Sequence, residues 1–168
     1  MAIIDVEIRN IFKGHADAIY TLIKEADKKS FFSGSADGFV GYWNLQNGTF
    51  EKPVAKVKSS IYSLLLKNSS TLLIGEQSGV FNVIDFASKS LVKSLQVAEQ
   101  GIFALAFLSQ FNLVILGAGD GNIYVLNHRY DVIQTINLCN KNIRSIDVSP
   151  CGKLSLIHIS EPTRRHLI

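Results

Sequence analysis

Short apolar runs separated by turn-forming residues fill most of this chain. One stretch contains IYSLLL, TLLIG, VFNVIDF and SLVKSLQV, and the next contains IFALAF, NLVILG, NIYVLN and DVIQTIN. β-Branched and aromatic residues dominate the runs, while Gly, Asn, Ser and Asp occupy the gaps, as is typical of β-strands joined by tight turns. The runs are too short for a helical period. Proline, which central strands exclude, is nearly absent. The pattern predicts an all-β fold.

A unit of four such runs recurs at a fixed period. Two markers repeat in phase: an isoleucine that opens the first run, and a glycine in a later turn. The isoleucines are Ile19, Ile61, Ile102 and Ile143, and the glycines are Gly38, Gly79 and Gly121. Both markers return about every 41 residues, and four strands in a unit of that length are typical of one blade of a β-propeller.

The first unit reads GHADAIYTL…FFSGSADGFVGYWNL, and in these residues the chain resembles the WD-repeat family. The resemblance covers roughly residues 1–153. It implies that four side chains form a hydrogen-bonded tetrad within the blade, and these are His15, Ser33, Asp37 and Trp43. An indole, a hydroxyl, an imidazole and a carboxylate offer donors and acceptors that suit such a chain. We expect the tetrad to be structural rather than catalytic.

The second and third units depart from this motif. Ser78 stands at the aspartate position of the second unit, and Leu126 stands at the tryptophan position of the third. We therefore expect these two blades to be held by apolar packing alone, without a polar network.

The predicted fold is a partial, open β-propeller with about three complete four-stranded antiparallel blades and the start of a fourth. Residues 1–11 are interpreted as a closing strand, 12–57, 58–98 and 99–139 as blades, and 140–153 as the start of the next blade. Closed propellers have about four to eight blades. We therefore interpret 1–153 as the N-terminal half of a truncated propeller. Such a fragment exposes blade edges through which it can self-associate.

The repeat pattern stops after Lys153. The following string, LSLIHISEPTR, resembles the in-frame translation of a transposase-based sequencing-library adapter. Residues 154–168 are accordingly interpreted as a non-native, adapter-derived tail, to which no function is assigned. The alternative is a natural strand followed by a proline-terminated tail.

Composition limits the possible partners and location. The chain has 168 residues, 47% hydrophobic and 18% charged, with a formal net charge of +3. The basic residues are scattered rather than gathered in a stripe, so no nucleic-acid partner is predicted. No apolar stretch reaches the ~18 residues of a membrane span, and the N-terminus lacks the pattern of a signal peptide. The two cysteines have no disulfide framework. A soluble, cytoplasmic protein is expected.

No catalytic, cofactor-binding or metal-binding residue is predicted. The chain lacks His/Asp/Glu clusters with ligand spacing, a nucleophile motif and a phosphate-binding loop. The remaining candidate is a surface. The family resemblance implies a partner-binding face at one mouth of the channel, formed here by Tyr20, Ser60, Tyr62, Gln77, Phe103, Asn142 and Arg144. Aromatic residues and arginine are common at interaction hot spots. The alternative is that the aromatics only pack between blades.

The leading hypothesis is a non-catalytic scaffold whose propeller presents one face to a protein or peptide partner of unknown identity. The alternative is a propeller enzyme, lactonase-like or quinoprotein-like, whose active-site residues lie in a missing half.

Overall fold

The structure is a computed structural model that describes residues 11–25, 29–46, 49–149 and 155–159; only the backbone is described for 49–52 and 155–159. All regular elements in these ranges are β-strands. Apart from Ile11, the predicted closing strand lies outside the described residues.

Twelve of the strands form three four-stranded antiparallel sheets, here called blades 1, 2 and 3. Blade 1 contains β1 (Ile19–Lys24), β2 (Ser30–Ser35), β3 (Phe39–Asn44) and β4 (Thr49–Lys56). Blade 2 contains β5 (Ile61–Leu66), β6 (Thr71–Glu76), β7 (Val80–Asp85) and β8 (Ser90–Gln96). Blade 3 contains β9 (Ile102–Leu108), β10 (Leu113–Ala118), β11 (Asn122–Leu126) and β12 (Val132–Asn137). Within each blade the strands follow one another in chain order.

A two-stranded sheet follows blade 3. In it, β13 (Ile143–Val148) pairs antiparallel with β14 (Ser155–Ile159). The strand β14 therefore occupies the place of the second strand of a fourth blade. The origin of residues 154–168 remains a prediction.

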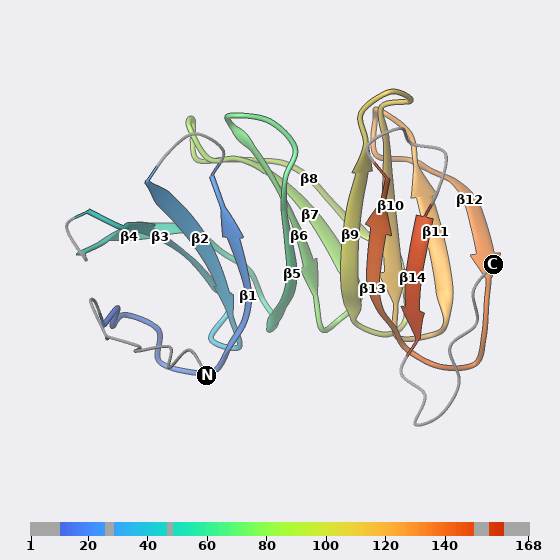
Figure 1. Cartoon of the computed structure of the whole chain (residues 1–168), viewed down its shortest axis with the longest axis horizontal. Coiled ribbons are helices and arrows are strands. Elements are labelled where there is room, and N and C mark those ends of the chain that lie inside the picture. Colours follow the sequence, from blue (N-terminus) through green and yellow to red (C-terminus); the bar gives the residue numbers. More distant parts are fainter. Residues whose placement is uncertain (1–10, 26–28, 47–48, 150–154, 160–168) are drawn as a thin grey trace, which may run out of the picture.

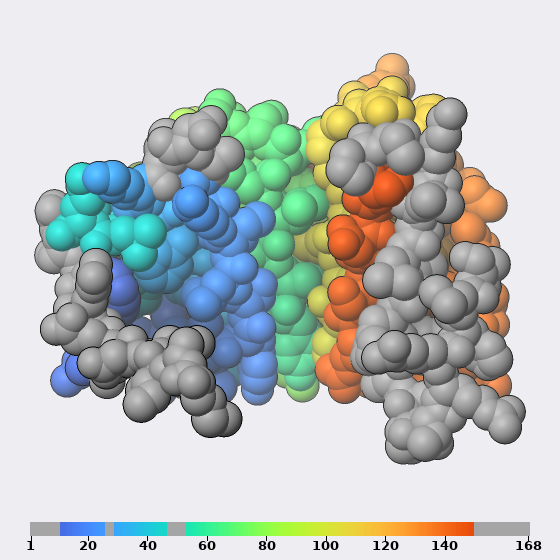
Figure 2. Space-filling view, viewed as in Figure 1, coloured from blue at the N-terminus to red at the C-terminus, as the bar shows by residue number. Residues whose placement is uncertain are grey.

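The blades stand side by side in an open arrangement (Figure 1). The first strands β1, β5, β9 and β13 are neighbours, and they form one surface from blade 1, in blue, to β13, in red (Figure 2). Blade 1 and the β13–β14 pair lie at opposite ends of the row (Figure 1). These features confirm the predicted all-β, partial propeller.

The repeating glycines lie in the turns between the second and third strands. Gly38, Gly79 and Gly121 have φ of +77°, +79° and +80°, a region that favours glycine. Each carbonyl accepts a hydrogen bond from the chain just after the fourth strand, as in Val97 N–H to Gly79 O at 3.1 Å. A Cβ atom at Gly79 would collide with the carbonyl of Ala98. Glycine therefore recurs at the position where the turn contacts the chain just after the outer strand.

The apolar core lies between the blades. One cluster joins blades 1 and 2 and includes Phe32, Ile61 and Ile84, all buried. A second cluster joins blades 2 and 3 and includes Phe81 and Leu116. Because successive side chains of a strand point to opposite faces, Ile84 and Phe81 of the same strand β7 serve different clusters. Each blade is thus buried by its neighbours rather than by itself.

Candidate functional site

The structure brings His15, Ser33, Asp37 and Trp43 into one hydrogen-bonded chain in blade 1. Trp43 Nε1–H donates to Ser33 Oγ at 2.6 Å. Ser33 Oγ lies 2.6 Å from His15 Nε2, and His15 Nδ1 lies 2.9 Å from Asp37 Oδ2. Ser33 already accepts from the indole and has one hydroxyl proton, which we assign to a bond to His15 Nε2. His15 then donates from Nδ1 to Asp37.

The Asp37 carboxylate is the last member of this chain of hydrogen bonds, and it also accepts from backbone N–H groups. Its Oδ1 accepts from Phe39 N–H at 2.9 Å, and its Oδ2 also accepts from Ala16 N–H at 3.0 Å. Burial by itself raises the pKa of Asp37, but the bonds from Phe39, His15 and Ala16 together hold that pKa below its ordinary value. The tetrad thereby fastens the segment before β1 to the β2–β3 turn.

Blades 2 and 3 contain polar clusters of their own, so the prediction that apolar packing alone holds them is wrong. In blade 2 the Glu76 carboxylate, 3% exposed, is the acceptor. It accepts from Asn82 Nδ2 at 2.6 Å, and from Ser59 N–H and Ser78 Oγ at 3.1 Å each. An asparagine inside the apolar run VFNVIDF was the available sequence signal, because a polar side chain buried there needs a partner.

In blade 3 a tyrosine makes the corresponding link. Tyr124 O–H donates to Asp120 Oδ2 at 2.6 Å, and Asn122 Nδ2 donates to the Tyr124 hydroxyl oxygen at 3.3 Å. Burial, followed by the bond to Asp120, raises the pKa of the Tyr124 phenol.

The three blades differ at one equivalent position, three residues after the turn glycine. Blade 1 has Gly41 there, blade 2 has Asn82 and blade 3 has Tyr124. A Cβ at Gly41 would lie 2.8 Å from both Ser33 Oγ and Trp43 Nε1. Blade 1 therefore leaves this position empty for the tetrad. Blades 2 and 3 fill it with a side chain that donates to a carboxylate of the same blade.

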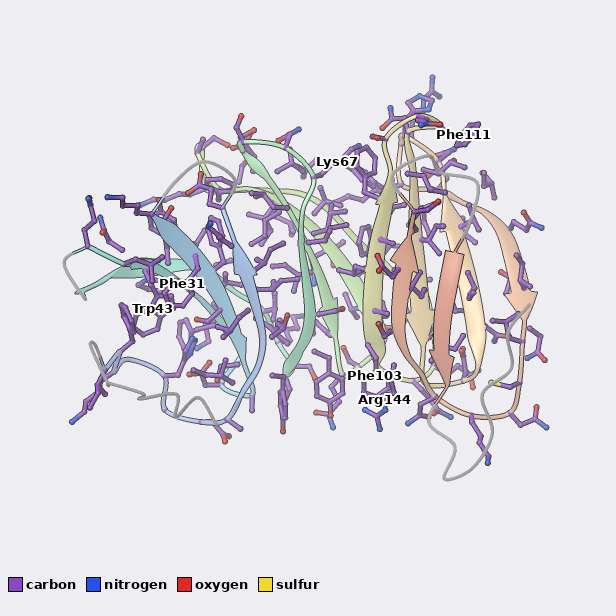
Figure 3. The ribbon with its side chains drawn as sticks, in the orientation of Figure 1. Phe31, Trp43, Lys67, Phe103, Phe111 and Arg144 are labelled. Carbon is purple, nitrogen blue, oxygen red and sulfur yellow. The ribbon has the colours of Figure 1, made fainter. Side chains whose placement is uncertain are left out.

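Four residues of the predicted partner-binding face form one row, here called the aromatic row: Tyr20, Tyr62, Phe103 and Arg144. Tyr20 and Tyr62 meet edge to face with ring centroids 5.1 Å apart. Tyr62 stacks on Phe103 at 4.9 Å, and Arg144 Cζ lies 4.1 Å from the centroid of the Phe103 ring. Each comes from the first strand of its unit, and Phe103 and Arg144 lie at one end of the blades (Figure 3).

The aromatic row is both packed across the blades and open to solvent. Its rings pack on one another across the blades, which leaves Tyr62 and Phe103 half-buried. The row also faces solvent, because Tyr20 is 54% exposed and Arg144 is exposed.

The polar members of the predicted face have different roles. Ser60 Oγ donates to the Ala36 carbonyl at 3.3 Å. The Asn142 amide, oriented by its partners, donates to the Gly119 carbonyl at 2.7 Å and accepts from Arg144 at 3.2 Å. Gln77 has an exposed side chain. Ser60 and Asn142 therefore hold loops in place beside the row, whereas Gln77 is open to solvent.

A cation–aromatic contact that the sequence did not reveal lies at the opposite end of the blades, where Figure 3 labels Lys67. Lys67 Nζ donates to Tyr130 O–H at 3.2 Å and lies 5.1 Å from the centroid of the Phe107 ring. This contact ties blade 2 to blade 3. Phe111, 62% exposed, lies at the same end.

The described residues lack two further kinds of feature. Within them, no three His, Cys, Asp or Glu side chains come together in a way that could hold a metal ion. The same residues include no helix long and apolar enough to cross a membrane.

Comparisons with known proteins agree with this architecture. The family model described as "WD domain, G-beta repeat" matches residues 6–44. The chain is similar to the crystal structure of the WD40 β-propeller domain of Doa1, with a TM-score of 0.78 and 14% identity over 87% of this chain and 49% of that chain. It thus spans about half the length of that structure. No curated protein matches the sequence.

Two computationally designed proteins of known crystal structure are also similar. Ika4 has a TM-score of 0.70 and 22% identity over 89% of this chain and 95% of that chain. Ika8 has a TM-score of 0.71 and 24% identity over 82% of this chain and 42% of that chain. At these identities the likeness concerns the fold.

Proposed function

We propose that the chain is a WD-repeat propeller protein and a non-catalytic scaffold whose aromatic row binds a protein or peptide partner. The family-model match over residues 6–44 and the propeller fold support this assignment. The main observation in support is that the aromatic row forms one set of contacts and faces solvent at one end of the blades. Buried aromatic and arginine anchors contribute much of the binding energy at protein interfaces.

The row is organised before any partner arrives. Stacking restrains the Tyr62 and Phe103 rings, so binding costs less side-chain entropy than it would for free rings. Glycines next to the rings let the backbone approach the rings closely. A Cβ at Gly101 would lie 3.0 Å from the Tyr62 ring, and one at Gly119 would lie 3.0 Å from the Phe103 ring.

The chemistry of the row defines a suitable ligand. The exposed Tyr20 ring offers apolar surface, and the Tyr20 and Tyr62 hydroxyls can donate or accept hydrogen bonds. Arg144 lies on Phe103, and its N–H groups are donors for a carbonyl or carboxylate. A peptide with an apolar side chain next to a hydrogen-bond acceptor fits this set.

The test is selection of peptides from a displayed random library on the purified chain, followed by affinity measurement on two variants. Tyr20→Ala combined with Phe103→Ala should weaken the selected peptides about tenfold or more. Phe111→Ala removes an exposed ring at the other end of the blades and should leave affinity unchanged. Equal binding by a folded Tyr20→Ala/Phe103→Ala variant would contradict the proposed face.

The propeller-enzyme alternative gains no specific support from the described residues. The cytoplasmic location and the absence of a nucleic-acid partner stay predictions.

A further inference from the structure

A groove lies between blades 1 and 2, on residues that the aromatic row does not use. Its volume is about 710 Å³. One wall is formed by residues 54–59, at the end of β4 and the loop after it, and the other by the faces of β7 and β8. We call it the inter-blade groove.

The inter-blade groove has an apolar lining. Val54 contributes from β4, Val80 from β7 and Leu91 from β8. Leu91 is 61% exposed, so this large aliphatic side chain is accessible from solvent. An exposed aliphatic surface in a concave setting is a feature of peptide-binding sites.

The charged side chains of the groove are mainly cationic. Lys56, Lys58 and Lys89 line it, and all three are exposed. Lys56 Nζ lies 4.8 Å from the centroid of the Phe39 ring. Within the described part of the chain none of the three lysines forms an ion pair. They are therefore available to an anionic ligand.

One carboxylate, Glu76, also lines the groove, but its neighbours already use it. It is 3% exposed and accepts hydrogen bonds from Asn82, Ser59 and Ser78. Because these donors surround the Glu76 carboxylate, the exposed lysines dominate the electrostatic potential of the groove.

The backbone beside the groove suits an extended ligand. The strand β4 is outermost in blade 1 and pairs only with β3. Lys56 and Lys58 are two residues apart. An extended peptide also presents alternate side chains to the same side, so alternating acidic and aliphatic residues match the spacing of this wall.

We propose that the inter-blade groove binds an extended acidic peptide segment of a partner protein. Carboxylates of the segment pair with Lys56, Lys58 and Lys89, and its aliphatic side chains pack on Val54, Val80 and Leu91. This second surface goes beyond the partner-binding face proposed above and uses none of its residues.

The experiment titrates the full chain into a fluorescein-labelled short peptide of alternating Glu and Leu and measures fluorescence anisotropy. Lys58→Glu combined with Lys89→Glu should weaken binding about tenfold or more, because each reversal turns attraction into repulsion. Leu91→Ser should weaken it about threefold or more through lost apolar contact. The charge-matched control is Lys24→Glu combined with Lys29→Glu, two exposed lysines outside the groove, and it should bind like the unaltered chain.

Several outcomes would overturn the proposal. One is no binding of the Glu/Leu peptide, and another is equal weakening by the groove variant and the charge-matched control. Equal affinity for a Glu/Ser peptide, or for a single-stranded oligonucleotide of similar length, would mean that charge alone is recognised. Tyr20→Ala/Phe103→Ala should leave the Glu/Leu peptide affinity unchanged, so the groove and the aromatic row can fail independently. Circular dichroism of each variant checks its fold.

Discussion

Blade 1 and blade 2 share the same strand order but hold their polar interiors together in different ways. In blade 1 the carboxylate is Asp37, from the β2–β3 turn, and it is reached through His15, Ser33 and Trp43. In blade 2 the carboxylate is Glu76, at the end of β6, and Asn82 reaches it directly.

The apolar positions change together with the polar ones. Ile74 and Ile84 of blade 2 occupy the places of Ser33 and Trp43 of blade 1, and both are buried in the cluster between blades 1 and 2. In each of the three blades a carboxylate near the turn between the second and third strands is hydrogen-bonded. Its side-chain donor comes from before the first strand in blade 1 and from the third strand in blades 2 and 3. A weak match to a motif therefore does not mean that a polar network is missing.

Removing the blade 2 carboxylate should lower the free energy of unfolding more than the other changes described below. Glu76→Ala leaves the buried Asn82 amide and the Ser59 N–H without their acceptor. We expect a loss of about 3 kcal/mol in the free energy of unfolding, measured by chemical denaturation. Glu99→Ala, at an exposed residue, is the control and should stay within about 0.5 kcal/mol. A similar stability for both variants would mean that apolar packing does hold blade 2.

Adding a side chain at Gly41 of blade 1 should lower the free energy of unfolding by an intermediate amount. Gly41→Ala places a Cβ against Ser33 Oγ and Trp43 Nε1, and we expect a cost of about 2 kcal/mol. The same change should cost less when His15→Ala has vacated space in the tetrad, so a double-mutant cycle should show coupling. Strictly additive losses would contradict the view that Gly41 is small because of the tetrad.

The free energy of unfolding should depend on pH with opposite sign through Asp37 in blade 1 and Tyr124 in blade 3. This is the smallest expected effect, about 1 kcal/mol for each of the two groups. The folded pKa of Asp37 is lowered, so its contribution is complete above its unfolded pKa of about 4 and disappears as pH falls through the folded value. The folded pKa of Tyr124 is raised, so its contribution is complete below about pH 10 and disappears as pH rises through the folded value.

Unfolding curves across pH, compared with those of Asp37→Asn and Tyr124→Phe, measure the two contributions. Each variant should flatten one limb of the stability profile, the acidic limb for Asp37→Asn and the alkaline limb for Tyr124→Phe. An unchanged acidic limb in Asp37→Asn would show that the tetrad carboxylate is not linked to folding.

The strands and turns could be predicted because each follows from local physics. Apolar and β-branched runs form the strands, and Gly38, Gly79 and Gly121 appear where the turn needs positive φ. The tetrad could be predicted because its four residue types stand at motif positions in one unit.

The clusters of blades 2 and 3 could not be predicted in the same way. Their members come from positions with no shared residue type, and Ser59 reaches Glu76 from 17 residues away. The contact of Lys67 with Tyr130 joins residues that are 63 apart. Asn82 inside an apolar run indicates that a partner is needed, but nothing in the local pattern identifies that partner.

The period, the strand class and the residues that can stand at each turn follow from the sequence, because these depend on neighbours along the chain. Tertiary structure alone decided which side chains meet across blades: that Tyr20, Tyr62, Phe103 and Arg144 form one row, and that lysines from β4, the loop after it and the β7–β8 turn line one groove. The physical reason is that contacts between blades depend on how one sheet stacks on the next, which no single unit encodes.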